Sequence, residues 1–199
     1  LGVIFNGEIY NHLELREELV ALGCVFQSDH SDTEVLLHGY RCWGPDFTNR
    51  LNGMWAFVLY DRRNGRLFCS RDRFGKKPFF YTLRNGTFLF ASELSAIVEH
   101  PAAAAAVSRR SLKKYFAYGY IPAPHSIYAD IQKILPGTWT RISTAEGTTT
   151  RGSYWSARDS VARAAGNRLQ LTDDECVDEL ERLIGESVKL QLEADVPVG

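Results

Sequence analysis

The stretch Phe5-Asn6-Gly7-Glu8-Ile9-Tyr10-Asn11 is the starting point for predicting the fold. The apolar run 3–5 predicts the end of a buried strand, and the pair Asn6-Gly7 favours a tight turn before a helix. The side-chain amide of Asn6 can donate two hydrogen bonds, and Gly7 lets its backbone N–H approach a bound atom closely. Two such donors at the end of a strand are able to hold an oxyanion. The alternative is a plain hairpin or strand-to-helix turn.

Two further motifs follow in order, Ser31-Asp32-Thr33-Glu34 and Arg71-Asp72-Arg73-Phe74-Gly75-Lys76-Lys77-Pro78. Together with the opening stretch, they resemble the class II glutamine amidotransferase domain of glutamine-hydrolysing asparagine synthetases. The order and spacing of the motifs resemble that family across nearly the whole chain. Further matches are 51–57, 90–93 and 119–124.

Composition limits the class of protein. The chain has 199 residues, 45% of them hydrophobic, which is enough for one complete domain and part of a second. A formal net charge of -1 argues against nucleic-acid binding, and no apolar run approaches a membrane span. The four cysteines show no Cys-x-x-Cys pair, which predicts reduced thiols and a cytoplasmic protein. They are Cys24, Cys42, Cys69 and Cys176.

The two ends of the sequence predict a fragment of a longer protein, because it starts at Leu1 rather than Met and stops as a strand begins at 195–199. We expect residues 1–155 to be the amidotransferase domain and 156–171, rich in Ala, Arg, Ser and Asn, to be a linker. Residues 172–199 then form the start of an ATP-dependent α/β synthetase domain, with an amphipathic helix capped by Thr172.

Strands in antiparallel pairs flanked by helices give an α+β fold class. The resemblance implies the four-layer αββα sandwich of N-terminal-nucleophile hydrolases. Asn11 with Glu14 predicts a capping box for the first helix, and Ser92 predicts the cap of a later short helix. Two hairpins are expected at Asn64-Gly65 and Asn85-Gly86. Strands are expected at 24–26, 54–60, 66–70, 79–83, 87–90, 137–142 and 148–155. Further helices are expected at 108–118 and between Ser31-Asp32 and Gly44-Pro45, through Val35, Leu36 and Tyr40.

The resemblance also implies roles for four residues. Asn6 and Gly7 match the oxyanion hole, and Glu8 and Asp32 match the carboxylates near the α-amino group of bound glutamine. Charge-assisted bonds to that ammonium are worth about 1.5–3 kcal/mol each, enough to select glutamine. From the residues alone, Asp32 is also a candidate helix N-cap, and both roles can hold because a carboxylate has two oxygens.

The family nucleophile is an N-terminal cysteine whose own α-amino group acts as the base. The four cysteines of this chain are internal, so we expect the nucleophile and the arginine that holds the glutamine carboxylate to precede Leu1. The fragment alone is expected to be inactive.

Two segments have a structural and a functional interpretation. The basic segment 71–78 lacks the glycine-rich context of a phosphate loop, so a strand–turn–strand with Gly75 at the bend is favoured. Either an Arg71–Asp72 pair or Ser92-Glu93 is then expected to brace the boundary between domains. Met54 and Trp55 are either core or part of the apolar passage that carries ammonia in the family, and core is favoured.

The resemblance therefore predicts the glutaminase half of an asparagine synthetase, which releases ammonia for ATP-dependent amidation of aspartate. Glutamine is the expected partner of this fragment, with no cofactor or metal of its own. ATP and Mg²⁺ are implied for the full-length protein, and a homodimer is allowed. The alternatives are an amidotransferase acting on a different carboxylate acceptor, or a β-lactam synthetase-like protein whose N-terminal domain does not hydrolyse glutamine.

Overall fold

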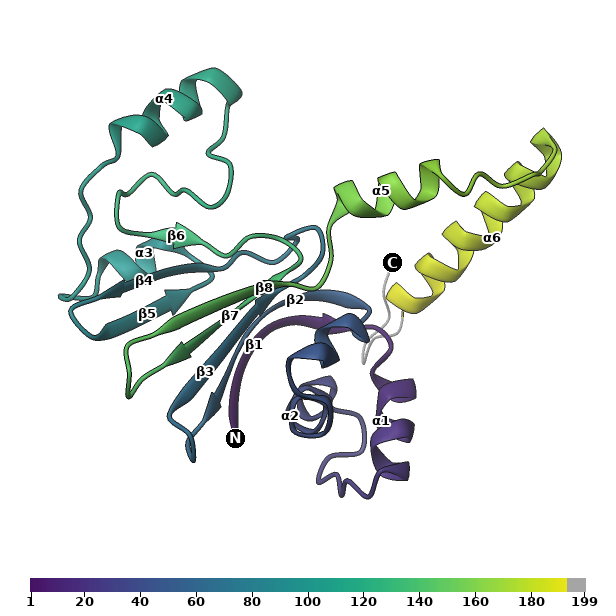
Figure 1. Cartoon of the computed structure of the whole chain (residues 1–199), viewed down its shortest axis with the longest axis horizontal. Helices are drawn as coiled ribbons and strands as arrows, with labels where there is room; N and C mark the ends of the chain where they lie inside the picture. Colours follow the sequence, from purple (N-terminus) through teal and green to yellow (C-terminus); the bar gives the residue numbers. More distant parts are fainter. Residues whose placement is uncertain (193–199) are drawn as a thin grey trace.

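A computed structural model describes residues 1–192 of the chain. Two antiparallel sheets dominate it (Figure 1). The larger sheet has the strand order β1-β2-β3-β7-β8, and the smaller has the order β5-β4-β6. The strands are β1 (Gly2–Ile9), β2 (Gly53–Asp61), β3 (Arg66–Arg71), β4 (Phe80–Arg84), β5 (Thr87–Ala91), β6 (Gln132–Lys133), β7 (Thr138–Ser143) and β8 (Thr149–Ser153).

The helices lie outside these sheets (Figure 1). Helices α1 and α2 pack on the larger sheet, and α3 contacts β5 of the smaller sheet. This arrangement gives the layer order helix, sheet, sheet, helix, in agreement with the expected αββα sandwich. The helices are α1 (His12–Ala21), α2 (Asp32–Trp43), the 3-10 helix η1 (Gly44–Asn49), α3 (Leu94–Val98), α4 (Arg109–Tyr118), α5 (Ala157–Ala165) and α6 (Asp173–Gln191).

Strand β2 separates two hydrophobic cores, because successive side chains of a strand point to opposite faces. Trp55, Phe57 and Leu59 pack with the buried leucines of α1 and α2. Ala56 and Val58 face the other way and pack with buried side chains of the smaller sheet. A strand buried on both faces requires an apolar run, and 53–61 supplies one.

The predicted hairpins at Asn64-Gly65 and Asn85-Gly86 are confirmed, with positive φ at Gly65, Asn85 and Gly86. The strands predicted after residue 53, the helix predicted between Ser31-Asp32 and Gly44-Pro45, and the helix at 108–118 are confirmed as well. Gly44 ends α2, and Ser108 caps α4 through a hydrogen bond from the Ser111 N–H.

Several local predictions are wrong. Asn6-Gly7 is not a turn, because β1 continues through it to Ile9. Segment 24–26 is not a strand. Asn11 is the N-cap residue of α1 as predicted, but the capping box is absent, since its side chain instead bonds the Arg50 carbonyl at 3.0 Å and the Asn52 N–H at 2.8 Å. Ser92 does not cap α3, whose N-cap is Glu93 without a side-chain bond.

Between residues 156 and 192 the chain forms the two helices α5 and α6 and no strand. The expected linker 156–171 contains helix α5, which Ser156 caps and which buries no residue. Helix α6 begins with the predicted cap, a complete capping box between Thr172 and Glu175. Its apolar stripe is exposed, with Val177 at 62% and Ile184 at 55%. The strand expected at 195–199 lies outside the described residues.

Candidate active site at the edge of the larger sheet

Strand β1 is an edge strand, and within residues 1–192 its only partner is β2. Gly7 lies opposite Trp55. Both main-chain groups of Trp55 point to the far side of β2, where its N–H donates to Asp72 Oδ2 at 3.3 Å and its carbonyl accepts the Asp72 N–H at 2.9 Å. Gly7 and Trp55 are therefore a non-hydrogen-bonded pair of the antiparallel ladder. It follows that the Gly7 N–H points away from β2, out of the open edge.

Asp32 lies on the same edge. The N–H of Ile9, two residues after Gly7, points out of the sheet in the same direction and donates to Asp32 Oδ2 at 3.1 Å. The rise along a strand is about 3.4 Å per residue, so the outward N–H groups of Gly7 and Ile9 are about 7 Å apart. The Asp32 carboxylate and the Gly7 donor therefore share one open edge.

Asp32 is the first residue of α2, and Ser31 is the cap, accepting the Glu34 N–H at 3.4 Å. The carboxylate of Asp32 therefore does not cap α2 and instead bonds β1. Its second oxygen accepts only the hydroxyl of Thr33, at 3.2 Å, among the described contacts. Lone pairs remain on both oxygens for a further donor.

Asn6 and Glu8 lie on one face of β1, because they are two residues apart. Asn6 pairs with Ala56, whose side chain faces the smaller sheet, so Asn6 also lies between the sheets. There its Nδ2 donates to Ser92 Oγ at 2.8 Å. Asn6, Gly7, Glu8 and Asp32 are all partly exposed, as a site that admits a ligand requires.

Glu8 lies opposite Met54 on the same face. Its negative charge reaches Tyr10, whose pKa is raised mainly by burial and further by the carboxylates of Glu8 and Asp72. The structure thus brings two carboxylates, Glu8 and Asp32, to the end of β1 that also carries the Asn6 and Gly7 donors.

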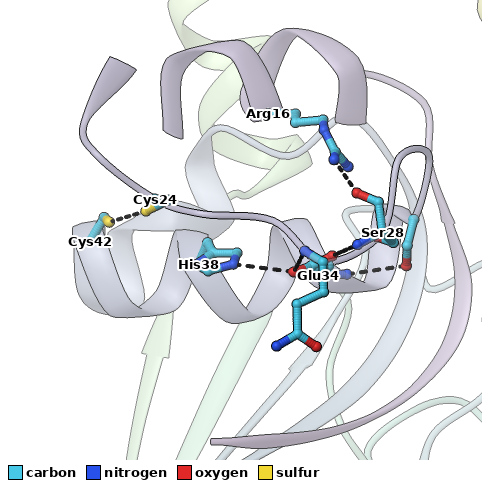
Figure 2. Close-up of polar contacts among 8 residues, drawn as sticks. Arg16, Cys24, Ser28, Glu34, His38 and Cys42 are labelled. Carbon is cyan, nitrogen blue, oxygen red and sulfur yellow. Dashed lines mark hydrogen bonds and ion pairs between the residues drawn. The ribbon is translucent and has the colours of Figure 1, made fainter. Parts of the chain in front are cut away.

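The loop before Asp32 is held by Glu34 (Figure 2). Glu34 accepts the N–H of Gln27 at 2.7 Å and the N–H of Ser28 at 2.9 Å, and it also accepts the Ser28 hydroxyl. These bonds lower the pKa of Glu34 to about 2, with the Ser28 hydroxyl as the largest cause. Arg16 of α1 donates to the Ser28 carbonyl from the other side. The loop that directly follows segment 24–26, which the sequence predicted as a strand, is therefore held by side chains.

The Asp72 carboxylate joins β2, the strand next to β1, to the loop at 74–77. Asp72 is 1% exposed and accepts the N–H groups of Trp55, Phe74, Lys76 and Lys77. Arg71 donates to the carbonyls of Gly75, Lys77 and Ile134. The expected Arg71–Asp72 side-chain pair is therefore wrong, since each side chain bonds the main chain instead. The predicted bend is confirmed, with Gly75 at a φ of 66°.

Trp55 is core, as favoured from the sequence. It is fully buried, its Nε1 donates to Ser70 Oγ at 3.2 Å, and its ring stacks on Tyr154 at 5.8 Å. Met54 is only partly buried and lies on the face shared with Glu8.

The cysteines do not supply a nucleophile to this edge. Cys69 is buried between the sheets, and burial raises its pKa. Cys24 and Cys42 lie with their sulfurs 3.4 Å apart (Figure 2), and burial followed by the Cys42 hydrogen bond raises the pKa of Cys24. Cys176 is exposed on α6.

Over the described part of the chain, no three His, Cys, Asp or Glu residues gather into a metal site. None of the helices in residues 1–192 is both long and apolar enough to cross a membrane.

The sequence profile of a glutamine amidotransferase domain matches residues 1–155. The chain belongs to this glutamine amidotransferase domain family. It is 36% identical over 197 residues to the glutamine-hydrolyzing asparagine synthetase 1 of Bacillus subtilis, covering 99% of this chain and 30% of that protein. It is 39% identical over 199 residues to asparagine synthetase 3 of the same organism, covering 98% of this chain and 30% of that protein. The chain thus spans about a third of the length of these relatives.

Solved structures support the fold. A glutamine phosphoribosylpyrophosphate amidotransferase from B. subtilis superposes with a TM-score of 0.53 at 21% identity, covering 77% of this chain and 29% of that one. This amidotransferase domain therefore has the α+β fold expected from its sequence.

The sequence did not predict the contact between Ser92 and Asn6; it assigned Ser92 to a helix cap or, with Glu93, to a brace between domains. The motif Phe90-Ala91-Ser92-Glu93 was the only available signal, and only the folded chain brings it to Asn6.

Proposed function

We propose that this domain binds glutamine along the open edge of β1 and serves as the glutaminase part of an asparagine synthetase. The observation that supports this most directly is the pair of groups on one edge, the Gly7 N–H and the Asp32 carboxylate beside the Ile9 N–H. The N–H groups of Gly7 and Ile9, which mark the two ends of this site, are about 7 Å apart along the strand. The α-amino nitrogen and side-chain carbonyl oxygen of glutamine are separated by five covalent bonds, or roughly 6 Å when extended. A glutamine molecule therefore fits between them lengthwise.

In this arrangement the ammonium of glutamine lies at Asp32, with Glu8 as a second carboxylate. The side-chain carbonyl lies at Asn6 and Gly7, whose Cα atoms are about 3.8 Å apart. When a thiolate attacks the carbonyl carbon, negative charge develops on its oxygen. The Asn6 Nδ2–H and the Gly7 N–H then stabilise this charge more strongly than they bind the neutral amide, which lowers the barrier.

We assign the attacking thiol to a cysteine outside residues 1–199, because the nucleophile of the family that the sequence resembles is an N-terminal cysteine. We assign ATP and Mg²⁺ to the synthetase domain of the whole protein, where ammonia amidates aspartate.

The test uses the natural protein that carries this chain and compares ammonia release from glutamine with release from 4-carbamoylbutanoate, which lacks the α-amino group. Loss of one or two charge-assisted bonds predicts a kcat/KM at least tenfold lower for the analogue. Equal rates would contradict the placement of the ammonium at Asp32. Absence of ammonia release from either compound would instead support the β-lactam synthetase-like alternative.

The acceptor is tested with glutamine labelled with nitrogen-15 in the side-chain amide, together with ATP, Mg²⁺ and aspartate. Formation of labelled asparagine supports the proposal. Ammonia release without asparagine would indicate a different carboxylate acceptor.

A further inference from the structure

The hydrogen bond between Asn6 and Ser92 joins the two sheets at the candidate site. Asn6 is in β1 of the larger sheet, and Ser92 directly follows β5 of the smaller one. The Asn6 Nδ2 donates to Ser92 Oγ at 2.8 Å, between residues 86 positions apart in the chain.

The Ser92 side chain does not cap the helix that follows it. Helix α3 starts at Leu94 after Glu93, and no side chain caps it. Asn6 is the hydrogen-bond partner that the structure gives to the Ser92 hydroxyl.

The side-chain amide of asparagine has two faces of opposite chemistry, an NH₂ that donates and an oxygen that accepts. Its terminal torsion is broad, so an unrestrained amide turns readily about its last bond. Only the NH₂ stabilises an oxyanion, because the amide oxygen would repel it. A partner that accepts one of the two N–H bonds fixes the plane of the amide and leaves the other N–H for a ligand.

We propose that Ser92 is a positioning residue for oxyanion stabilisation: its hydroxyl holds the Asn6 amide in the orientation that presents an N–H to the glutamine carbonyl. This inference rests on the proposed function. Because Ser92 directly follows β5 of the smaller sheet, it also makes the geometry of the oxyanion site depend on how the two sheets pack.

The main test compares Ser92→Thr with Ser92→Val in the natural protein that carries this chain. Thr and Val have nearly the same shape, and only Thr keeps a hydroxyl. We expect Ser92→Val to lower the glutaminase kcat about tenfold or more, with the KM for glutamine changed less than twofold and with ammonia-dependent synthesis unchanged. Ser92→Thr should retain most of the kcat. Equal kcat values for the two variants would overturn the proposal.

A double-mutant cycle shows whether Ser92 acts through Asn6. Ser92→Ala should lower kcat in the native background and have little further effect in Asn6→Ala. Full additivity would contradict the proposal while leaving the role of Asn6 intact. An unchanged kcat in Asn6→Ala alone would instead contradict the proposed function, and with it this inference.

Ser95→Ala is the matched control, because Ser95 lies in the adjacent α3, and its hydroxyl contacts only the exposed Glu93, at 3.5 Å. It should leave kcat unchanged. Thermal unfolding of each variant identifies any loss of folded protein. A kcat loss that follows the unfolded fraction would assign Ser92 to stability alone.

Discussion

The carboxylate of Asp32, at the start of α2, accepts the N–H of Ile9 at the end of β1, at 3.1 Å. This one bond places the second motif of the sequence beside the first. Through this bond Asp32 stabilises the fold, while its remaining lone pairs are available to a ligand. A variant that tests ligand binding must therefore keep the bond to Ile9.

Asp32→Asn separates them, because the Asn oxygen can still accept the Ile9 N–H while the charge is lost. We expect the KM for glutamine to rise at least tenfold through loss of a charge-assisted bond to the ammonium, with ammonia-dependent synthesis intact. The control is Asp29→Asn, since Asp29 lies in the preceding loop with its side chain 91% exposed. Loss of both activities in Asp32→Asn would indicate a folding role.

Asn6→Ala removes one of the two proposed oxyanion donors. We expect kcat for glutamine hydrolysis to fall by about 10²–10³ with little change in KM, because the interaction strengthens only in the transition state. Steady-state ammonia release measures this. Asn49→Ala is the control, since the Asn49 side chain bonds only the exposed Asp46 carbonyl. An unchanged kcat would reduce Asn6 to a structural residue.

Gly7→Ala tests the close approach of the two strands. A Cβ at Gly7 would lie 2.1 Å from the Met54 carbonyl oxygen and 2.8 Å from the Trp55 Cα, both main-chain atoms that cannot turn aside. We expect a free energy of unfolding lower by about 3 kcal/mol or more, measured by urea denaturation. Gly2→Ala in the same strand meets nothing within 4 Å and should be nearly neutral. Comparable losses in the two variants would contradict the strand register.

Glu34→Gln tests the loop that precedes Asp32. The folded protein lowers the pKa of Glu34 from 4.5 to about 2. Ionised Glu34 therefore stabilises the fold fully above pH 4.5, and this contribution is lost as the pH falls towards 2. Urea midpoints between these two pH values should fall less steeply in Glu34→Gln than in the native protein.

The same variant should raise the KM for glutamine, because the loop positions Asp32. Glu175→Gln is the matched control: it removes a carboxylate whose pKa is also lowered, mainly by the Thr172 N–H, on α6. It should leave the KM unchanged. An unchanged KM in Glu34→Gln would show that the loop and the glutamine site are independent.

Three of the four Asn-Gly pairs of the chain show which local structures the sequence alone could predict. Those at 64–65 and 85–86 are hairpin turns, as predicted, because each lies between two strands that pair with one another. The pair at 6–7 is in a strand, since Gly7 is required there by the neighbouring main chain of 54–55. This contact with 54–55 arises only in the tertiary fold, and a local sequence pattern does not encode it.

The residues of the candidate site were likewise predicted only in part. The resemblance selected Asn6, Gly7, Glu8 and Asp32, and the structure brings them to one end of β1. Ser92 was missed because its partner is 86 residues away. Segment 24–26 was mistaken for a strand because it is a short apolar run, but only Cys24 and Phe26 pack against the core, and Val25 is 81% exposed.

The open edge of β1 has a consequence for self-association. Main-chain donors along an unpaired strand are a template for a strand of another chain, and Ile4, 65% exposed on β1, adds apolar surface there. A strand added at this edge would take the Gly7 N–H that the proposed glutamine site uses. Aggregation through β1 and occupation by substrate are therefore mutually exclusive, and glutamine should act as a solubilising ligand for this domain.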